Sequence, residues 1–142
     1  MGARANVVLV GTLPKNTAVN MTNENKLVYS PVIYTHWYGG EINNVVQTFI
    51  DKYITDTSDT NMEPTMRREV ERAFPIFTEI LDEKGIKYQV FNFPRSADFE
   101  RKLPTANDMP IIADDYGLYI VNVNTMSGHV SMFDWKRATE EQ

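Results

Sequence analysis

The sequence contains no cysteine among its 142 residues. A chain without thiols forms no disulfide, offers no thiolate nucleophile and holds no cysteine-ligated zinc or iron–sulfur cluster. No apolar run approaches the roughly 18 residues that a membrane span needs, and the first residues lack the apolar core of a secretory signal peptide. We therefore expect a protein of a reducing compartment and, by default, of the cytoplasm.

Basic residues are outnumbered, with 14 lysines and arginines against 19 aspartates and glutamates, which gives a formal charge of −5. Binding of nucleic acid through its phosphates has no global electrostatic support at this charge. Histidine is scarce too, and neither His36 nor His129 stands in a spacing typical of a metal site. We expect no metal, no cofactor and no nucleic-acid partner.

What the chain does have is the composition of an ordinary globular protein, with 42% hydrophobic and 23% charged residues. A chain of this length buries roughly 68–70% of the surface that its extended form exposes, which is enough for a core of its own. No internal repeat and no linker-like tract divides it. The composition predicts a single domain over residues 1–142.

One stretch stands out, residues 27–41, where a strand of aromatic and β-branched residues runs through a double glycine into a helix. We expect the rest of the chain to cover this stretch or to pair with it. Pro31 lies in the strand and has no backbone N–H, so the strand must bulge there or lie at an edge. An almost continuous apolar run at residues 5–11 predicts another strand, buried on both faces and central in a sheet.

Two amphipathic patterns predict consecutive helices. In residues 42–54 apolar side chains recur at helical spacing from Ile42 onwards, which is the most regular pattern in the sequence. A second stripe follows a possible capping box at residues 60–63 and ends at Gly85, a typical residue after a helix. Pro75 interrupts this stripe and predicts a kink or a break near Arg72.

Strands are expected again at residues 86–93, 110–113, 116–123 and 129–135, with a hairpin turn at 124–128 and a polar tail from Lys136 that should fray. Residues 110–123 form either two strands with a turn at 114–115 or one bent strand. The order of elements favours an α+β fold, a two-layer sandwich in which a mostly antiparallel sheet of about five strands carries two consecutive helices on one face. The proline-punctuated residues 95–110 form a candidate lid.

The junction between strand and helix holds the candidate ligand site, His36, Trp37, Tyr38, Gly39 and Gly40. A helix N-terminus attracts anions and glycine lets a ligand approach closely, while aromatic side chains supply walls. A simpler interpretation is that the glycines only permit a sharp turn and that the aromatic residues belong to the core.

The same region carries a resemblance to known sequences. The residues concerned are Arg4-Ala5-Asn6-Val7-Val8, Tyr34-Thr35-His36-Trp37-Tyr38-Gly39-Gly40-Glu41 and the amphipathic helix that follows. This pattern, which covers residues 1–55, resembles a group of small uncharacterised phage and prokaryotic proteins that carry a Tyr-x-His-Trp-x-Gly-type motif. The polar insertion at residues 14–25 is longer than in that group. The resemblance implies a phage-type origin and no particular activity.

Three functions remain open from the sequence. The leading hypothesis is a non-enzymatic accessory protein that binds a host protein, or another copy of itself, through an aromatic surface, because no complete catalytic constellation is present. The second is a protein that holds or sequesters an anionic metabolite or nucleotide at residues 36–40. The third is a small hydrolase that uses His36 with a carboxylate such as Asp114. We expect no catalytic residues under the leading hypothesis.

Overall fold

The computed structural model describes residues 3–13, 26–57, 66–92, 108–111, 115–123 and 133–138. The strands and helices within these ranges, in chain order, are β1 (Ala5–Leu13), β2 (Lys26–Tyr29), β3 (Val32–Thr35), the short helix η1 (Gly39–Glu41), α1 (Ile42–Thr57), α2 (Met66–Glu83), β4 (Gln89–Phe91), β5 (Gly117–Val123) and β6 (Phe133–Ala138). Neither long helix within these ranges has the length and apolar content that crossing a membrane requires.

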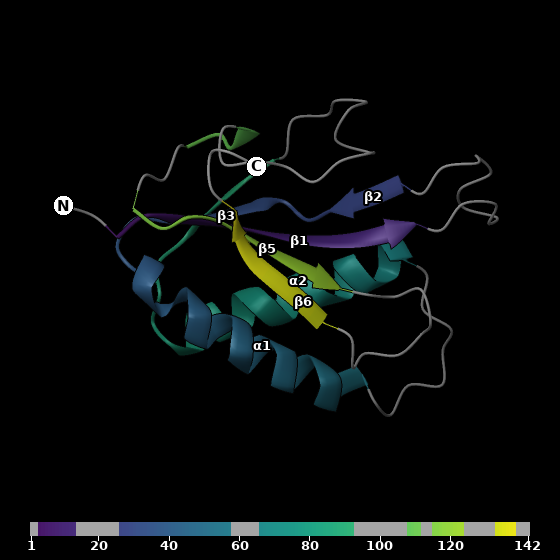
Figure 1. The fold of residues 1–142 in the computed structure, drawn as a ribbon. Coiled ribbons are helices and arrows are strands. Elements are labelled where there is room, and N and C mark those ends of the chain that lie inside the picture. Colours follow the sequence, from purple (N-terminus) through teal and green to yellow (C-terminus); the bar gives the residue numbers. More distant parts are fainter. Residues whose placement is uncertain are drawn as a thin grey trace.

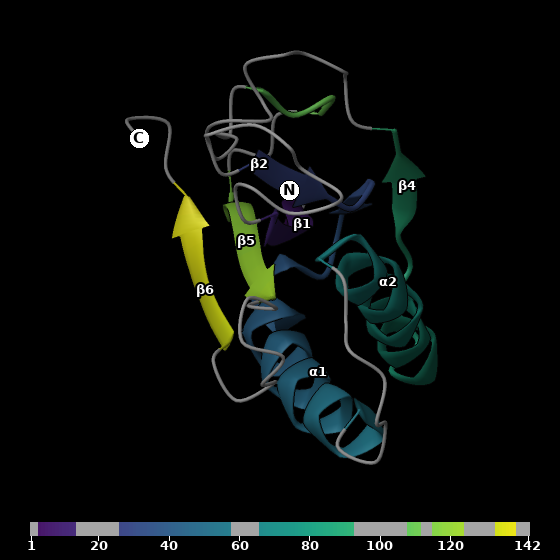
Figure 2. The same ribbon diagram turned by 90° about the vertical axis from the view of Figure 1, so that its right-hand side faces the viewer.

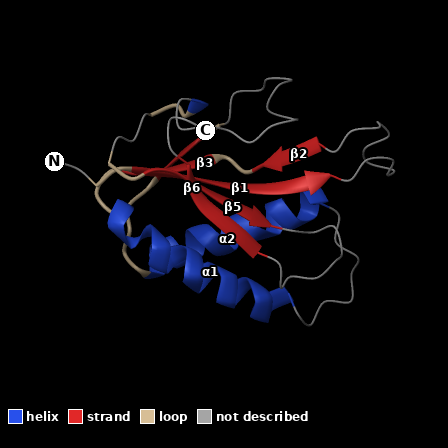
Figure 3. Ribbon diagram, in the orientation of Figure 1, coloured by secondary structure: helices blue, strands red, loops and turns tan. Residues whose placement is uncertain are grey.

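The strands form one sheet in the order β4-β3-β1-β5-β6, and β2 also pairs with β1. All of these pairs are antiparallel except β1 with β5, which run parallel. Both α-helices lie on the same face of the sheet (Figures 1 and 3). The two-layer α+β sandwich predicted from the order of elements is confirmed.

The centre of the sheet is β1, because its side chains alternate between two buried layers. Ala5, Val7 and Leu9 face the helices and join the larger core, whereas Val8 and Val10 belong to a second apolar cluster on the opposite face. All five are at most 1% exposed. The expectation of a central strand buried on both sides is confirmed, and β1, not the stretch at residues 27–41, holds the middle of the sheet.

A β-bulge at Ser30 and Pro31 divides the neighbouring strand into β2 and β3. Val10 pairs with Tyr29 in β2, while Val7 pairs with Ile33 in β3, so the second strand holds one residue more between the two pairs. Such an extra residue bends a strand and lets a proline sit inside a sheet. The bulge predicted from Pro31 is therefore confirmed.

The hydroxyl of Ser30 supplies a hydrogen-bond acceptor to β1 at the point where Pro31 interrupts the regular pairing of the two strands. The backbone N–H of Leu9 donates to Ser30 Oγ at 2.9 Å, and the Ser30 N–H donates to the Leu9 carbonyl at 2.9 Å. Ser30 Oγ in turn donates to the Pro31 carbonyl at 2.9 Å. The side chain thus takes the place of a main-chain acceptor in a buried part of the sheet.

The helices pack on the sheet and on each other through aromatic side chains. Phe49 of α1 lies edge-on to Phe77 of α2, with the ring centroids 5.3 Å apart, and both side chains are fully buried. At the rim of this contact, Lys52 Nζ lies 3.2 Å from Glu79 Oε1 and 3.5 Å from Glu83 Oε1. The hydrogen bond that Lys52 donates to Glu79, with the charges of both glutamates, raises the pKa of Lys52 above its ordinary value.

Helix α1 begins at Ile42, as its periodicity predicts, and continues to Thr57. Helix α2 continues through Pro75, so the break suggested as one outcome near Arg72 does not occur. Pro75 is exposed, so its ring lies on the solvent side of the helix and not in the core. The helix ends at Glu83, and Gly85 follows it as the expected C-terminal cap, with a φ of 71° and an N–H that donates to the Asp82 carbonyl.

Several predicted strands differ from the observed ones. The strand expected at residues 86–93 is limited to β4 within the described range, and residues 110 and 111 are not in a strand. Residues 136–138, expected to fray, form the end of β6. These residues form a strand because they pair with β5, although their polar sequence did not predict one. The capping box at 60–63, the candidate lid at 95–107, the turn at 124–128 and His129 lie outside the described residues.

Candidate functional site

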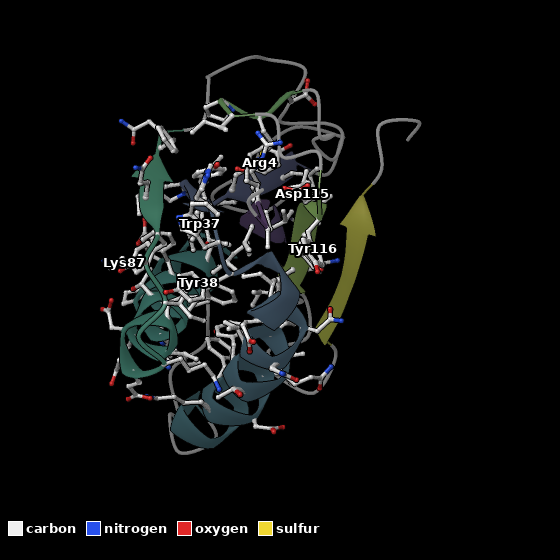
Figure 4. The ribbon with its side chains drawn as sticks, turned by 90° about the vertical axis from the view of Figure 1, so that its left-hand side faces the viewer. Arg4, Trp37, Tyr38, Lys87, Asp115 and Tyr116 are labelled. Atoms are coloured by element: carbon white, nitrogen blue, oxygen red, sulfur yellow. The ribbon has the colours of Figure 1, made fainter. Side chains whose placement is uncertain are left out.

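The predicted site lies at the end of the molecule where β1 and β5 begin and β3 ends (Figure 4). Residues 36–40 form the link from β3 to α1 at this end. His36, Trp37 and Gly40 are exposed, Tyr38 is half-buried and Gly39 is buried. The five residues therefore divide into an outward-facing aromatic part and a part that packs against the chain itself.

The aromatic part is built on Tyr34, which is 6% exposed and lies on β3 opposite Asn6 of β1. The Tyr34 hydroxyl is 2.8 Å from His36 Nδ1, and the Tyr34 ring also meets Phe91 of β4 edge-on at 6.4 Å. The bond therefore orients the His36 ring from the buried side.

Trp37 extends this chain of contacts to the surface. Its ring meets the His36 ring edge-on, with centroids 4.5 Å apart and an interplanar angle of 80°. The side chain is nevertheless 59% exposed, which makes it the most exposed large hydrophobic residue in the described part of the chain. The Trp37 side chain is thus exposed to solvent, while the neighbouring His36 is hydrogen-bonded to the buried Tyr34.

The glycine part of the site is occupied by the protein's own main chain. The Gly39 N–H donates to the Ala3 carbonyl at 2.6 Å. A Cβ added at Gly39 would lie 2.5 Å from that oxygen and 2.5 Å from the Tyr116 ring, whereas one at Gly40 would meet only the Tyr116 hydroxyl at 3.3 Å. Close packing against Ala3 and Tyr116 therefore explains the need for glycine at position 39.

Sequence reasoning did not bring Arg4, Asp115 and Tyr116 together at this site. Arg4 Nε lies 3.3 Å from Asp115 Oδ2, and the Arg4 backbone N–H donates to the same oxygen at 3.2 Å. That backbone bond, with the guanidinium, lowers the pKa of Asp115 below its ordinary value. The Tyr116 N–H donates to the Arg4 carbonyl at 3.0 Å. No local pattern signals this cluster, because its two halves are 111 positions apart.

The charges here are poorly arranged for an anion. Glu41 stands in the first turn next to α1, and the guanidinium of Arg4 faces Asp115. A carboxylate at a helix N-terminus neutralises the positive end of the helix dipole, which would otherwise attract a phosphate or carboxylate ligand. No cluster of three potential metal ligands occurs among the described residues. Asp114, which the hydrolase hypothesis needs, lies outside them, so that hypothesis stays a prediction.

Strand β4 forms one border of the sheet beside this site. Gln89 and Val90 are both exposed, and Val90 at 47% is the other exposed large hydrophobic residue of the described chain. Tyr88, just before β4, is half-buried, and this burial, followed by the charge of Asp82 on α2, raises its pKa. Packing of Tyr88 against the larger core fixes the start of β4 on the molecule.

Comparisons with protein-family models, with curated proteins and with solved structures found no match to this chain. The resemblance to small phage and prokaryotic proteins therefore stays a prediction based on residues 4–8 and 34–41. The function has to be argued from the geometry alone.

Proposed function

We propose that this protein is a non-enzymatic accessory protein that acts by binding another protein, with Trp37 as the anchor of the contact. The observation that carries the proposal is the exposure of Trp37 on a support of His36 and the buried Tyr34. Tryptophan is among the residues that most often dominate the binding energy of protein interfaces. A side chain whose surroundings are already ordered also loses less conformational freedom on binding.

The alternative, a protein that holds an anionic metabolite or nucleotide at residues 36–40, has weaker support. The Gly39 amide already donates to the Ala3 carbonyl, so it is not available to a phosphate. Glu41 adds negative charge beside the site, and the Arg4 guanidinium is already paired with Asp115. The exposed ring of Trp37 suits a protein partner without any need for free amides.

The test is capture of partners by the immobilised protein from a lysate of the cells that naturally contain it, with quantification by mass spectrometry. Trp37→Ala should lower the capture of a specific partner by at least about thirtyfold, the equivalent of a hot-spot side chain. Asn43→Ala, an exposed change on α1, is the matched control and should leave capture unchanged.

Self-association is followed on the same variants by sizing chromatography over a range of concentrations. A protein that stays monomeric and retains no partner that Trp37→Ala releases would contradict the proposal. A thermal shift with nucleotides that disappears in His36→Ala would instead support the alternative.

A further inference from the structure

The link from β3 to α1, which carries Trp37, is anchored at both ends. At its start, the Tyr34 hydroxyl lies 2.8 Å from His36 Nδ1. At its far end, the Gly39 N–H donates to the Ala3 carbonyl at 2.6 Å. Because Trp37 lies between these two anchors, the direction in which its ring faces solvent depends on both of them.

The second anchor belongs to residues 3–4, which come just before β1. In the sheet, β1 has β3 and β4 on one side and β5 and β6 on the other (Figure 2). Residues 3–4 continue β1 beyond its first pairs, in which Ala5 lies opposite Thr35 and Gly117. Residues beyond the last pair of a strand fray unless further bonds hold them. The position of the Ala3 carbonyl therefore depends on the bonds that residues 3–4 make.

Asp115 and Tyr116, which precede β5, hold residues 3–4 in place. The Arg4 N–H donates to Asp115 Oδ2 at 3.2 Å, and Arg4 Nε lies 3.3 Å from the same oxygen. The Tyr116 N–H donates to the Arg4 carbonyl at 3.0 Å. The bond from the Arg4 main chain, ahead of the guanidinium, is also the first cause of the lowered pKa of Asp115. Figure 4 shows these three residues at the same end of the molecule as Trp37.

We propose that Asp115 is a positioning residue for the contact with the partner protein, because it holds the chain before β1 beside the link and thereby fixes the direction of Trp37. The series of bonds starts with the Arg4 N–H on Asp115 Oδ2. The carbonyl of the preceding residue, Ala3, then accepts from the Gly39 N–H, two positions after Trp37. A side chain that is oriented before binding loses less conformational freedom in the complex. This inference rests on the proposed function, because it assigns Trp37 to a protein contact.

The direct test follows Trp37 by fluorine NMR in full-length protein labelled with 5-fluorotryptophan. The chain has two tryptophans, so Trp37→Phe assigns both resonances, and Trp135 serves as the internal reference because it pairs with Val121 toward the other end of β5. Asp115→Ala should sharpen the Trp37 resonance and move it toward that of the free amino acid, because a released link lets the ring reorient faster. Asp115 is exposed, so its truncation opens no cavity in the core.

Two further variants test the order of the bonds. Arg4→Ala keeps the backbone N–H that donates to Asp115, so it should change the Trp37 resonance less than Asp115→Ala does. Gly39→Ala disturbs the same anchor from the side of the link, because its Cβ would meet the Ala3 carbonyl. It should therefore change the Trp37 resonance in the same direction as Asp115→Ala.

The matched control is Ser30→Ala, which separates positioning from a general loss of stability. It removes the buried bond from the Leu9 N–H, far along β1 from residues 3–4, and should leave the Trp37 resonance in place. Binding is followed with the immobilised variants in the lysate experiment. Asp115→Ala should retain about two- to tenfold less of the partner that Trp37→Ala releases.

The outcomes separate the inference from the proposed function. A Trp37 resonance that Asp115→Ala leaves unchanged, or that Ser30→Ala changes equally, would overturn the inference, and so would undiminished capture of the partner by Asp115→Ala. The proposed function would stand in each of these cases if Trp37→Ala still released that partner. If Trp37→Ala released no partner while the resonance changed as expected, the proposed function would fail and Asp115 would orient a ring without a role in binding.

Discussion

Removal of a single hydroxyl at the bulge is expected to destabilise the whole protein. Ser30 is 2% exposed and Leu9 is fully buried, so Ser30→Ala leaves the Leu9 N–H without its acceptor and with no access to water. Among the described hydrogen bonds, no main-chain acceptor replaces the Ser30 hydroxyl as the partner of the Leu9 N–H.

The expected cost is about 1–3 kcal/mol, the usual penalty for a buried donor left unsatisfied. The total stability of a domain is only about 5–15 kcal/mol, so this loss is readily measured. Urea denaturation should show a lower midpoint with an unchanged slope, because the surface exposed on unfolding stays the same. For a chain of this size the melting temperature should fall by about 3 to 10 °C.

The matched control is Thr48→Val, which also deletes one hydroxyl. Thr48 Oγ1 donates to the Asn44 carbonyl at 2.8 Å on the exposed side of α1, where water can replace the bond. This change should cost less than about 0.5 kcal/mol. If Ser30→Ala were no more destabilising than Thr48→Val, or if hydrogen exchange of the Leu9 amide were unchanged, the role given to the Ser30 hydroxyl would be refuted.

Three further predictions concern the site and its surroundings. Gly39→Ala should lower the free energy of unfolding, measured by urea denaturation, by about 1–3 kcal/mol or more, because its Cβ would meet the Ala3 carbonyl. Gly40→Ala should change it by less than about 1 kcal/mol. Equal effects of the two changes would contradict the close packing of Gly39 against Ala3. Asn6→Leu should change the free energy of unfolding by less than about 1 kcal/mol, because two effects oppose each other. The hydrogen bond from Asn6 Nδ2 to the Ile111 carbonyl is lost, but the buried Oδ1, which has no partner in the described part of the chain, is removed as well. A loss above about 3 kcal/mol would indicate a partner for Oδ1. Folding lowers the pKa of Asp115, so its contribution to stability is present above the unfolded-state pKa and is lost as pH falls through the folded-state pKa. Asp115→Asn should therefore lower stability near neutral pH and have no effect in strong acid. A difference that persisted in acid would show that the charge of Asp115 is not the cause.

The sequence predicts most of the elements whose signal is local. The helical spacing that starts at Ile42 marks the start of α1, because a single face of that helix is buried. The apolar run of β1 predicts burial on both faces, and Pro31 predicts the bulge, because a missing N–H has to be accommodated wherever the strand lies. The glycine at position 85 marks the end of α2 for an equally local reason.

Features that depend on distant parts of the chain could not be read in this way. The pairing of β1 with β5 and the ion pair of Arg4 with Asp115 join residues that share no pattern in sequence. Of the candidate site, the sequence could not show that Trp37 is exposed or that Gly39 packs against Ala3 and Tyr116. The end of β6, from Lys136 to Ala138, is a strand because it pairs with β5, which lies earlier in the chain and is not indicated by the sequence of this tail.

The parallel pairing of β1 with β5 has a consequence for the synthesis of the chain. Ala5 at the start of β1 pairs with Gly117 at the start of β5, so β1 emerges from the ribosome long before its partner on that side exists. Closing such a separation costs loop entropy and slows folding, and nascent chains with unpaired strands are prone to aggregate. Truncation before Gly117 should therefore yield chains that depend on chaperones, since β1, which is buried on both faces, then lacks its parallel partner.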